Sequence, residues 1–352
     1  MRADLPGSVA NAIERASRPS LVFDLARIDA NLMQLVAAAR AVGATALFAA
    51  KSFAHPAVRA LAAERLDGFD VASAGELAEL PAARVVSIAD PTGRAGDARA
   101  ERVIVGCETV DQVLRAPAGA EIAVRVSASI AGRDPAVGAI LDGASGHRRS
   151  RFGVERAEQL AALAAAAGGR PVGLHVHHGP VAAAAAERFV ASARAALALA
   201  GEAGVVPRFI DLGGAWHAIP ALGPALVEIR AAVPGEIELI VEPGRALADG
   251  AGFACGRVCV ARDALRVADL SRICHLRWSQ VELVGAAPRP GAGGHVLVVG
   301  ATCFEEDVIG EWTVEPAQLA AGARLVLRNV TGYAVGWNAS FGGVPVADVV
   351  MA

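Results

Sequence analysis

The sequence contains a single lysine. Lys51 stands alone among 33 basic residues, so the other 32 are arginine. Arginine can replace lysine wherever only a charge or an ion pair is needed, but its guanidinium stays protonated, whereas a lysine amine can lose its proton and attack a carbonyl. Because Lys51 ends the apolar run 45–51 instead of lying on a charged helix face, we interpret it as a chemically active, Schiff-base-forming residue.

Basic tracts, long apolar runs and paired cysteines are lacking as well. The net charge is −3 and no basic segment is interleaved with aromatic residues, which argues against a nucleic-acid partner. No uncharged run reaches the roughly 18 apolar residues of a membrane helix, and residues 1–20 lack the apolar core of a signal peptide. The five cysteines show neither metal-ligand nor disulfide-framework spacing. We therefore expect a cytoplasmic protein with no metal and no membrane contact.

A repeating pattern of strands and helices fills the first two thirds of the 352 residues. After a helix predicted at 27–43, eight short apolar runs alternate with alanine-rich helical patterns. The runs are apolar throughout, which is typical of parallel strands buried on both faces. They lie at 45–51, 68–73, 84–90, 102–107, 121–127, 173–179, 207–214 and 237–245. Eight such units predict a (β/α)8 barrel, and the alternative is an open, doubly wound sheet.

Polar residues at the ends of these runs favour the barrel. A barrel gathers the C-terminal ends of its strands at one mouth, whereas an open sheet strings them along a line. Nearly every run ends in a polar group, and these groups are Lys51, Asp70 with Ser73, Asp90, Arg125, His175 with His177, Asp211, and Glu242 with Arg245. We expect them to converge on one site.

The last third has a different pattern. Residues 246–352 lack long helical patterns and show β-like segments at 253–260, 295–299, 324–330 and 333–337, separated by Gly/Pro clusters. The opening segment 20–24 fits no barrel position, so we expect it to pair with this second domain. The predicted organisation is a strand region at 1–26 that joins the β-domain, a barrel at 27–245 and a C-terminal β-domain at 246–352.

The chemistry at the strand ends suggests a cofactor. Loops after the seventh and eighth strands of a barrel usually bind phosphate, and here they read DLGG at 211–214 and EPGR at 242–245. Pyridoxal 5′-phosphate carries both a phosphate and an aldehyde for Lys51. A carboxylate such as Glu242 against its ring nitrogen makes the ring a strong electron sink. We expect this cofactor, with His177 stacked on its ring.

Eight short motifs resemble those of the fold-type III pyridoxal-phosphate decarboxylases, the family of diaminopimelate and ornithine decarboxylases. They follow the family order and lie at 48–51, 68–76, 151–153, 173–179, 211–214, 242–245, 300–307 and 332–333. The resemblance implies an alanine racemase-like barrel followed by a β-sandwich or β-barrel domain. It also implies decarboxylation of an L- or meso-configured amino acid.

The resemblance further implies roles for single residues. Lys51 would hold the cofactor aldehyde, Glu242 its ring nitrogen, and Cys303 would return a proton after carbon dioxide leaves. A head-to-tail homodimer is implied, in which Cys303, Asp307 and Tyr333 of one subunit complete the site of the other. The residues expected to contact the cofactor are Lys51, Asp70, Ser73, Arg125, His177, Gly213, Gly214, Glu242, Gly244, Arg245 and Tyr333, the only tyrosine.

One departure from the family concerns the substrate. The residue after the cysteine is usually acidic and receives a distal amine, but here it is Phe304. A buried ammonium without a partner is costly, which disfavours diaminopimelate, lysine and ornithine unless Glu305 or Glu306 takes over. We expect substrate contacts from Asp307, His275 and Arg277. The basic residues suggest a carboxylate-rich substrate, such as the amino-acid conjugates decarboxylated in siderophore assembly.

Two alternatives use the same cofactor. An amino-acid racemase of this fold needs a second base, and alanine racemases place arginine on the ring nitrogen, so Glu242 and Cys303 favour decarboxylation. A non-catalytic pyridoxal-phosphate carrier resembles a barrel alone, and the 107 residues after Arg245 argue against it.

Overall fold

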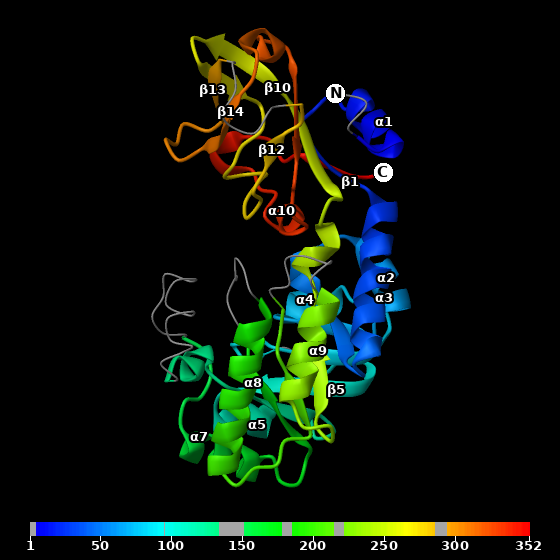
Figure 1. The fold of residues 1–352 in the computed structure, drawn as a ribbon, viewed down its shortest axis with the longest axis vertical. Helices are drawn as coiled ribbons and strands as arrows, with labels where there is room; N and C mark the ends of the chain where they lie inside the picture. Colours follow the sequence, from blue (N-terminus) through cyan, green and yellow to red (C-terminus); the bar gives the residue numbers. More distant parts are fainter. Residues whose placement is uncertain (1–4, 95, 134–150, 178–184, 215–221, 286–293) are drawn as a thin grey trace. The chain divides into compact units, whose positions relative to one another are not determined.

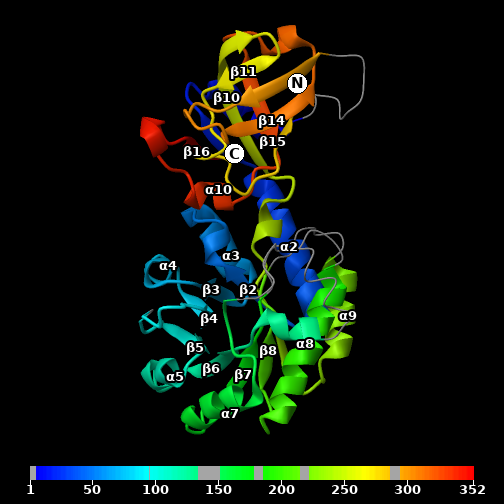
Figure 2. The same ribbon diagram turned by 90° about the vertical axis from the view of Figure 1, so that its left-hand side faces the viewer.

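The computed structural model describes residues 5–94, 96–133, 151–177, 185–214, 222–285 and 294–352. The chain divides into two compact units, which Figures 1 and 2 show in two views. The β unit comprises Met1–Asn31, Ser52–Val58 and Leu247–Ala352, and the barrel unit comprises Leu32–Lys51 and Arg59–Ala246. Residues 27–31 and 52–58, which the sequence pattern placed with the barrel, therefore belong to the β unit.

The barrel unit is a closed barrel of eight parallel strands in sequence order, and β2 pairs with β9 to complete the circle. The strands are β2 (Thr45–Ala49), β3 (Gly68–Val71), β4 (Ala83–Ile88), β5 (Ala100–Cys107), β6 (Glu121–Arg125), β7 (Val172–His175), β8 (Phe209–Asp211) and β9 (Glu238–Val241). Each lies within or overlaps one of the eight runs predicted from the sequence. The barrel prediction is confirmed, and the open sheet is wrong.

Helices connect the strands and lie on the outside of the barrel (Figure 2). They are α3 (Pro56–Arg65), α4 (Ala74–Ala78), α5 (Val110–Arg115), α7 (Ala157–Ala166), α8 (Ala185–Glu202) and α9 (Leu222–Ala232), preceded by α2 (Leu25–Ala41) and joined by the 3-10 turns η2 (Ala50–Ser52), η3 (Ala128–Arg133) and η5 (Arg245–Ala248). A capping box starts α5, where Thr109 and Gln112 exchange side-chain and backbone hydrogen bonds. Within the described ranges, no helix has the length and apolarity to cross a membrane.

The barrel interior is packed with apolar side chains. One buried cluster takes a residue from each of six strands and consists of Leu47, Val85, Ile104, Ala123, Phe209 and Ile240. Phe209 fills the centre so closely that a methyl group on Gly173 would lie 2.4 Å from its ring. Alternate strands supplying layers of inward side chains make such a barrel a solid core, which leaves the strand ends as the place for a site.

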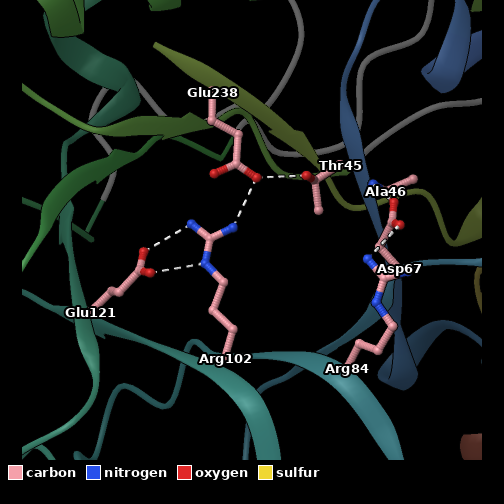
Figure 3. Close-up of polar contacts among 7 residues, drawn as sticks. All are labelled: Thr45, Ala46, Asp67, Arg84, Arg102, Glu121 and Glu238. Carbon is pink, nitrogen blue, oxygen red and sulfur yellow. Dashed lines mark hydrogen bonds and ion pairs between the residues drawn. The ribbon is translucent and has the colours of Figure 1, made fainter. Parts of the chain in front are cut away.

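A polar network closes the N-terminal end of the barrel (Figure 3). Arg102 on β5 donates two hydrogen bonds to Glu121 at 3.0 and 2.8 Å, and a third to Glu238 at 2.8 Å. Thr45 donates to the same Glu238 oxygen at 2.6 Å. Burial pushes the pKa of Glu238 up, but the hydrogen bonds from Arg102 and Thr45 outweigh it, and the pKa is lowered. Arg102 therefore links β5 to the next strand, β6, and to β9, where Glu238 is 136 residues away in the chain.

We expect Arg102→Met to lower the free energy of unfolding by about 1–3 kcal/mol, because it removes the guanidinium that pairs with two partly buried carboxylates. Urea unfolding of the variant measures this. The matched control is Arg84→Met: the ion pair of Arg84 with Asp67 is 3.7 Å long and exposed, so its loss should change stability by less than about 0.5 kcal/mol.

Lowering the pH tests the same interaction between Arg102 and Glu238 in a second way. Since the pKa of Glu238 is lowered in the folded state, its pairing stabilises the protein above the unfolded pKa of about 4.3 and is lost as the pH falls through the folded value. The difference between wild type and Arg102→Met should therefore shrink below about pH 4. Equal losses in the Arg84 and Arg102 variants would contradict the role assigned to the network.

The β unit is built on a mixed sheet. Its central order is β12-β15-β10-β11-β13-β14, and β1 pairs antiparallel with β10 and parallel with β16. The elements are α1 (Gly7–Arg15), β1 (Ser20–Phe23), β10 (Gly252–Arg262), β11 (Leu265–Ala268), β12 (Glu282–Leu283), β13 (His295–Val299), β14 (Val308–Thr313), η6 (Pro316–Leu319), β15 (Arg324–Arg328), α10 (Tyr333–Gly336), η7 (Phe341–Gly343) and β16 (Asp348–Met351). The helix α1 packs its apolar face, Val9, Ala12 and Ile13, on this sheet.

The predicted strand at 333–337 is wrong, because this segment is the short helix α10. The N–H of Trp337 donates to the carbonyl of Tyr333 at 3.1 Å, and that of Val335 donates to Gly332 at 3.0 Å. Gly332 packs so tightly that a methyl group on it would lie 2.5 Å from the ring of Phe53. The alternation of apolar residues was misleading here, since tertiary packing around Gly332 favours a turn.

Candidate active site

A cavity of about 390 Å³ lies at the C-terminal ends of the barrel strands. Its wall contains most of the strand-end residues that the sequence singled out. These are Lys51, Asp70, Asp90, Arg125, His175, His177 and Glu242, joined by Glu108, Gln112, Arg151 and Phe152 among others. All of them belong to the barrel unit. The barrel topology thus brings side chains from positions 51 to 242 to one mouth.

Lys51 and Asp70 form an ion pair in this cavity. Lys51 lies in η2, directly after β2, and its Nζ donates to Oδ2 of Asp70 at 2.8 Å. The lysine side chain is 34% exposed, whereas that of Asp70 is fully buried. The buried Asp70 therefore holds the amine in place, while the amine itself remains accessible from the cavity.

A pair of buried carboxyl groups lies at the ends of the adjacent strands β8 and β9. Asp211 is the last residue of β8, and Glu242 directly follows β9. The two side chains share a hydrogen bond. Burial raises the pKa of Asp211 to about 6, against the opposing effect of the Gly213 N–H that donates to it. Burial, followed by the charge of Asp211, raises the pKa of Glu242 well above its ordinary value. This end of the cavity therefore favours a ligand that brings a positive charge or an N–H donor.

His175 completes this buried cluster. It is the last residue of β7, and its Nε2 lies 3.6 Å from Oε1 of Glu242. The Nη1 atom of Arg125 lies 3.0 Å from Nε2 and 3.2 Å from Nδ1 of the same ring. Burial, followed by the charge of Arg125, lowers the pKa of His175 well below its ordinary value, so the imidazole is neutral at pH 7.

The glycine loop after β8 lies against His177. Gly213 has a φ of +66°, which glycine adopts readily, and a methyl group built on it would lie 2.5 Å from Cδ2 of His177. Its N–H donates to Asp211 at 2.8 Å and its carbonyl accepts from the N–H of Glu242 at 2.9 Å. The loop after β9 continues with buried Gly244 and half-buried Arg245. Residues 178 and 179, which end the histidine motif, lie outside the described residues.

Ser73 has a different role from the expected one. It is exposed and forms the N-cap of α4, where its Oγ accepts a hydrogen bond from the N–H of Glu76 at 3.2 Å. Its side chain does not line the cavity. The motif around it positions the helix rather than offering a hydroxyl to the cofactor, and we correct the expectation accordingly.

Two residues expected to bind substrate are engaged inside the β unit. Asp307 is buried, and its carboxylate accepts four hydrogen bonds, from Ser271 Oγ, the Arg272 N–H, and the N–H and Oγ1 of Thr302. His275 is also fully buried; its Nδ1 accepts from the N–H of Ser271 and its Nε2 donates to Pro345 O. Because all their polar atoms have partners, we withdraw both from the substrate site.

The other β-unit candidates remain accessible. Cys303 is exposed, and Arg277 lies over the ring of Trp337 at 4.3 Å. Tyr333 is half-buried and makes an edge contact with Trp278, with ring centroids 5.0 Å apart. Arg277 and Tyr333 thus belong to one aromatic cluster, in which Trp278 also contacts Trp337 with ring centroids 5.6 Å apart.

No role was predicted from the sequence for two residues of the buried cluster. His175 and Asp211 were only noted as polar strand ends. A signal for them was present in the strand register, since Arg125 pairs with His175 and His175 pairs with Asp211 on adjacent strands. Residues paired across parallel strands lie at the same level along the barrel axis. The side chains of Arg125, His175 and Asp211 are therefore expected to lie close together.

The polar atoms of the cavity fit pyridoxal phosphate. Asp70 Oδ1 and Glu242 Oε1 are buried, yet no residue in the described ranges donates a hydrogen bond to either. Buried side-chain oxygens almost always have a partner, so a ligand donor is expected there. A protonated pyridine nitrogen supplies such a donor for Glu242, and Lys51 supplies the amine for the aldehyde.

Comparison with known proteins agrees with this chemistry. The family model "Pyridoxal-dependent decarboxylase, pyridoxal binding domain" matches residues 26–249, which is more than half of the chain. A search of curated proteins finds no match.

Several solved structures share the fold over nearly the whole chain. The arginine decarboxylase of Paramecium bursaria Chlorella virus bound to agmatine has a TM-score of 0.78 at 19% identity, covering 98% of this chain and 100% of its own. The diaminopimelate decarboxylase of Helicobacter pylori complexed with L-lysine has 0.77 at 18% identity, covering 97% and 93%. The lysine/ornithine decarboxylase of Vibrio vulnificus complexed with putrescine has 0.75 at 17%, covering 98% and 97%. At such identities the likeness establishes the fold. Together with the family match, it shows that the chain belongs to the pyridoxal-dependent decarboxylases, with pyridoxal phosphate as the cofactor.

Proposed function

We propose that this protein releases the α-carboxylate of an L- or meso-configured amino acid as carbon dioxide. The observation that carries the proposal is the joint placement, in one cavity, of the Lys51 amine and the unpartnered Glu242 oxygen. When bound, pyridoxal phosphate supplies an electron-poor ring that accepts the electron pair left by the departing carbon dioxide. The protein supplies attachment, orientation and charge.

Each of the polar groups in the cavity has a role in the proposed reaction. Lys51 binds the aldehyde, and the buried Asp70 fixes the position of its amine. Glu242 would accept the hydrogen bond of a protonated ring nitrogen and hold its proton there. His175, neutral and next to Glu242, would line the space for the ring. Burial of these groups excludes water, which strengthens every charge interaction with the ring.

The carboxylate favours decarboxylation over racemisation. Glu242 holds the ring nitrogen protonated, which makes the ring a strong electron sink and favours loss of carbon dioxide from the α-carbon. In the described part of the barrel cavity the guanidinium groups come from Arg125 and Arg151, and Arg125 contacts His175. A racemase would need an arginine at the position of Glu242, so we regard racemisation as the second candidate.

Side chains of the β unit support one class of substrate. Phe304 is 49% exposed and packs against Phe341, with ring centroids 5.1 Å apart. The carboxylate of Asp307 already accepts four hydrogen bonds within the β unit. Neither Phe304 nor Asp307 therefore offers a free negative charge to a distal ammonium group. Arg277 is exposed and offers a positive charge. These features support a substrate whose distal part is anionic, such as a carboxylate-rich amino-acid conjugate.

The test of this function is a substrate panel. Purified protein with added pyridoxal phosphate is incubated with basic amino acids, diaminopimelate and conjugates that carry additional carboxylates, and carbon dioxide and the amine product are measured. We expect release from the carboxylate-rich members. Brisk release from diaminopimelate alone would contradict the substrate class, and inversion without release would favour the racemase.

We further propose a head-to-tail homodimer in which Cys303 and Tyr333 of one subunit serve the barrel of the other. Cys303 is exposed, and its thiol would return a proton to the α-carbon of the substrate after carbon dioxide leaves. Cys303→Ala is then expected to lower the amine formed per carbon dioxide at least about tenfold, with the cofactor absorbance unchanged. Cys259→Ala, which alters another exposed thiol, is the matched control.

Mixing two inactive variants tests the shared site. In a head-to-tail dimer, a Lys51→Ala subunit paired with a Cys303→Ala subunit has one site with both changes and one without any. Re-association of the mixture should therefore raise the rate of amine formation above that of either variant alone. An unrestored mixture of properly folded dimers would show that Cys303 does not serve the site of the partner subunit.

A further inference from the structure

Cys303 lies in the hairpin loop that joins the antiparallel strands β13 and β14. The loop comprises residues 300–307, and its base is closed by the N–H of Gly300, which donates to the carbonyl of Asp307 at 2.7 Å. A tighter turn lies inside it, because the N–H of Asp307 donates to the carbonyl of Phe304 at 3.0 Å. Cys303 is exposed, whereas Asp307 is only 1% exposed. The loop therefore presents a thiol to the outside and turns a carboxylate inward.

The two oxygens of the Asp307 carboxylate bind two different loops of the β unit. Oδ2 accepts from the N–H of Thr302 at 3.0 Å and from its Oγ1 at 2.7 Å. Oδ1 accepts from the N–H of Arg272 at 2.6 Å and from Oγ of Ser271 at 3.1 Å, in the segment that follows β11. One buried carboxylate thus fixes the hairpin loop to the neighbouring segment.

The residues on both sides of Cys303 depend on this carboxylate. Thr302, before the cysteine, binds it with its N–H and its hydroxyl, and the N–H of Phe304, after the cysteine, donates to Oγ1 of Thr302 at 3.4 Å. A methyl group on Gly300 would lie 2.3 Å from Oδ2 of Asp307, so the carboxylate reaches Thr302 only because position 300 has no side chain. The glycine, the threonine and the aspartate of this loop therefore act together to hold its cysteine.

We propose that Asp307 is a positioning residue for the thiol of Cys303. The inference rests on the proposed function, in which this thiol returns a proton to the α-carbon after carbon dioxide leaves. Proton transfer needs the two atoms within hydrogen-bond reach, and a displacement of about 1 Å can slow such a step about a hundredfold. Hydrogen bonds from backbone N–H groups to a charged carboxylate are stronger than those between neutral groups, so Asp307 can hold an exposed loop in one position.

Asp307→Asn tests the positioning role, because an amide fills nearly the same volume as a carboxylate. The carboxylate offers one oxygen to the N–H of Thr302 and the other to that of Arg272, whereas an amide has a single acceptor oxygen. Asparagine therefore keeps at most one of the two links. We expect the amine formed per carbon dioxide to fall at least about threefold, with the absorbance of the bound cofactor unchanged.

A double variant shows whether Asp307 acts through the thiol. When Cys303 is already alanine, Asp307→Asn should change the amine formed per carbon dioxide by less than about twofold, because the group that it positions is absent. An equal fall with and without the thiol would show that Asp307 acts in another way, and would overturn the inference.

Two changes at Thr302 keep the inference testable if Asp307→Asn does not fold. Thr302→Val removes the hydroxyl and with it the bonds to Asp307 and from Phe304, so the amine yield should fall at least about twofold. Thr302→Ser retains the hydroxyl and should behave like wild type. Glu306→Gln removes an exposed charge of the same loop and is the second control. Unchanged yields in Asp307→Asn and Thr302→Val would contradict the positioning role.

Hydrogen exchange separates this inference from the proposed function. Amide exchange of the peptide that contains residues 300–307 is measured on the full-length, cofactor-loaded protein by mass spectrometry. Exchange should accelerate at least about tenfold in Asp307→Asn and stay at the wild-type rate in Glu306→Gln. Wild-type exchange in Asp307→Asn would show that the carboxylate does not hold the loop. If wild type releases no carbon dioxide from any substrate, the proposed function fails, whatever the exchange rates are.

Discussion

Replacing Lys51 by arginine is expected to abolish covalent attachment of pyridoxal phosphate and to lower carbon dioxide release at least roughly a thousandfold, which corresponds to about 4 kcal/mol of barrier. Arginine retains the positive charge that Asp70 binds at 2.8 Å, so the fold should survive. Its guanidinium does not lose a proton and therefore does not attack the aldehyde.

The composition makes this experiment unusually clean. Lys51 is the only lysine, so its amine is the only side-chain amine that can be trapped. Borohydride reduction of the wild-type complex, followed by peptide mapping, should label the peptide that contains Lys51 and no other internal peptide. The control is Arg59→Lys, which introduces a second lysine at a buried position paired with Glu79 and should remain unlabelled. A labelled, active Lys51→Arg protein would refute the assignment.

Replacing Glu242 by glutamine should slow decarboxylation roughly 10²- to 10³-fold, the loss typical for removing one preorganised electrostatic group from a reacting centre. Glutamine is close to isosteric, so the cofactor should still bind. It does not hold the ring nitrogen protonated, however, and the ring becomes a weaker electron sink. The rate of carbon dioxide release and the absorbance of the bound cofactor measure the two effects separately.

The same variant should stabilise the cofactor-free protein. Burial, and then the charge of Asp211, raises the pKa of Glu242 well above its ordinary value. The folded state then binds a proton more tightly than the unfolded chain, and stability is lost as the pH rises above the unfolded pKa of about 4.3. Glutamine has no such loss. We expect Glu242→Gln to raise the free energy of unfolding at pH 7 by roughly 1–3 kcal/mol, a gain that disappears near pH 4.

Glu238 on the same strand provides the opposite control. It lies at the start of β9, where Arg102 and Thr45 lower its pKa. Glu238→Gln should therefore lower stability at pH 7 and leave the rate of carbon dioxide release unchanged. If both glutamine variants change stability in the same direction, the charge balance assigned to the two ends of the barrel is wrong.

Much of the barrel was predictable because its strands are buried on both faces. In a run such as 45–49 only Thr45 at the start is partly exposed, so the residues after it are apolar, and Lys51 stands out where the run ends. The segment 333–337 also showed a β-like pattern but became a helix. The difference is tertiary: a methyl group on Gly332 would clash with Phe53, and no sequence-local feature records that contact.

The site was predictable in its location and less so in its details. The convergence of Lys51, Asp70, Arg125 and Glu242 follows from their places at strand ends. The hydrogen bonds that occupy the Asp307 carboxylate do not follow from the sequence, because the donors Ser271 and Arg272 are 36 and 35 residues away in the chain. Whether a polar side chain is available to a ligand depends on such distant partners.

The sequence by itself determined the architecture and the chemistry of this protein, through the period of its apolar runs and through one amine that could not be exchanged for a guanidinium. The tertiary structure alone decided that His175 lies beside Glu242 and His177 against Gly213, and it paired Asp211 with Glu242. The physical reason is that strand periodicity places a residue on a face, whereas its neighbours there come from other strands whose register only the closed barrel establishes.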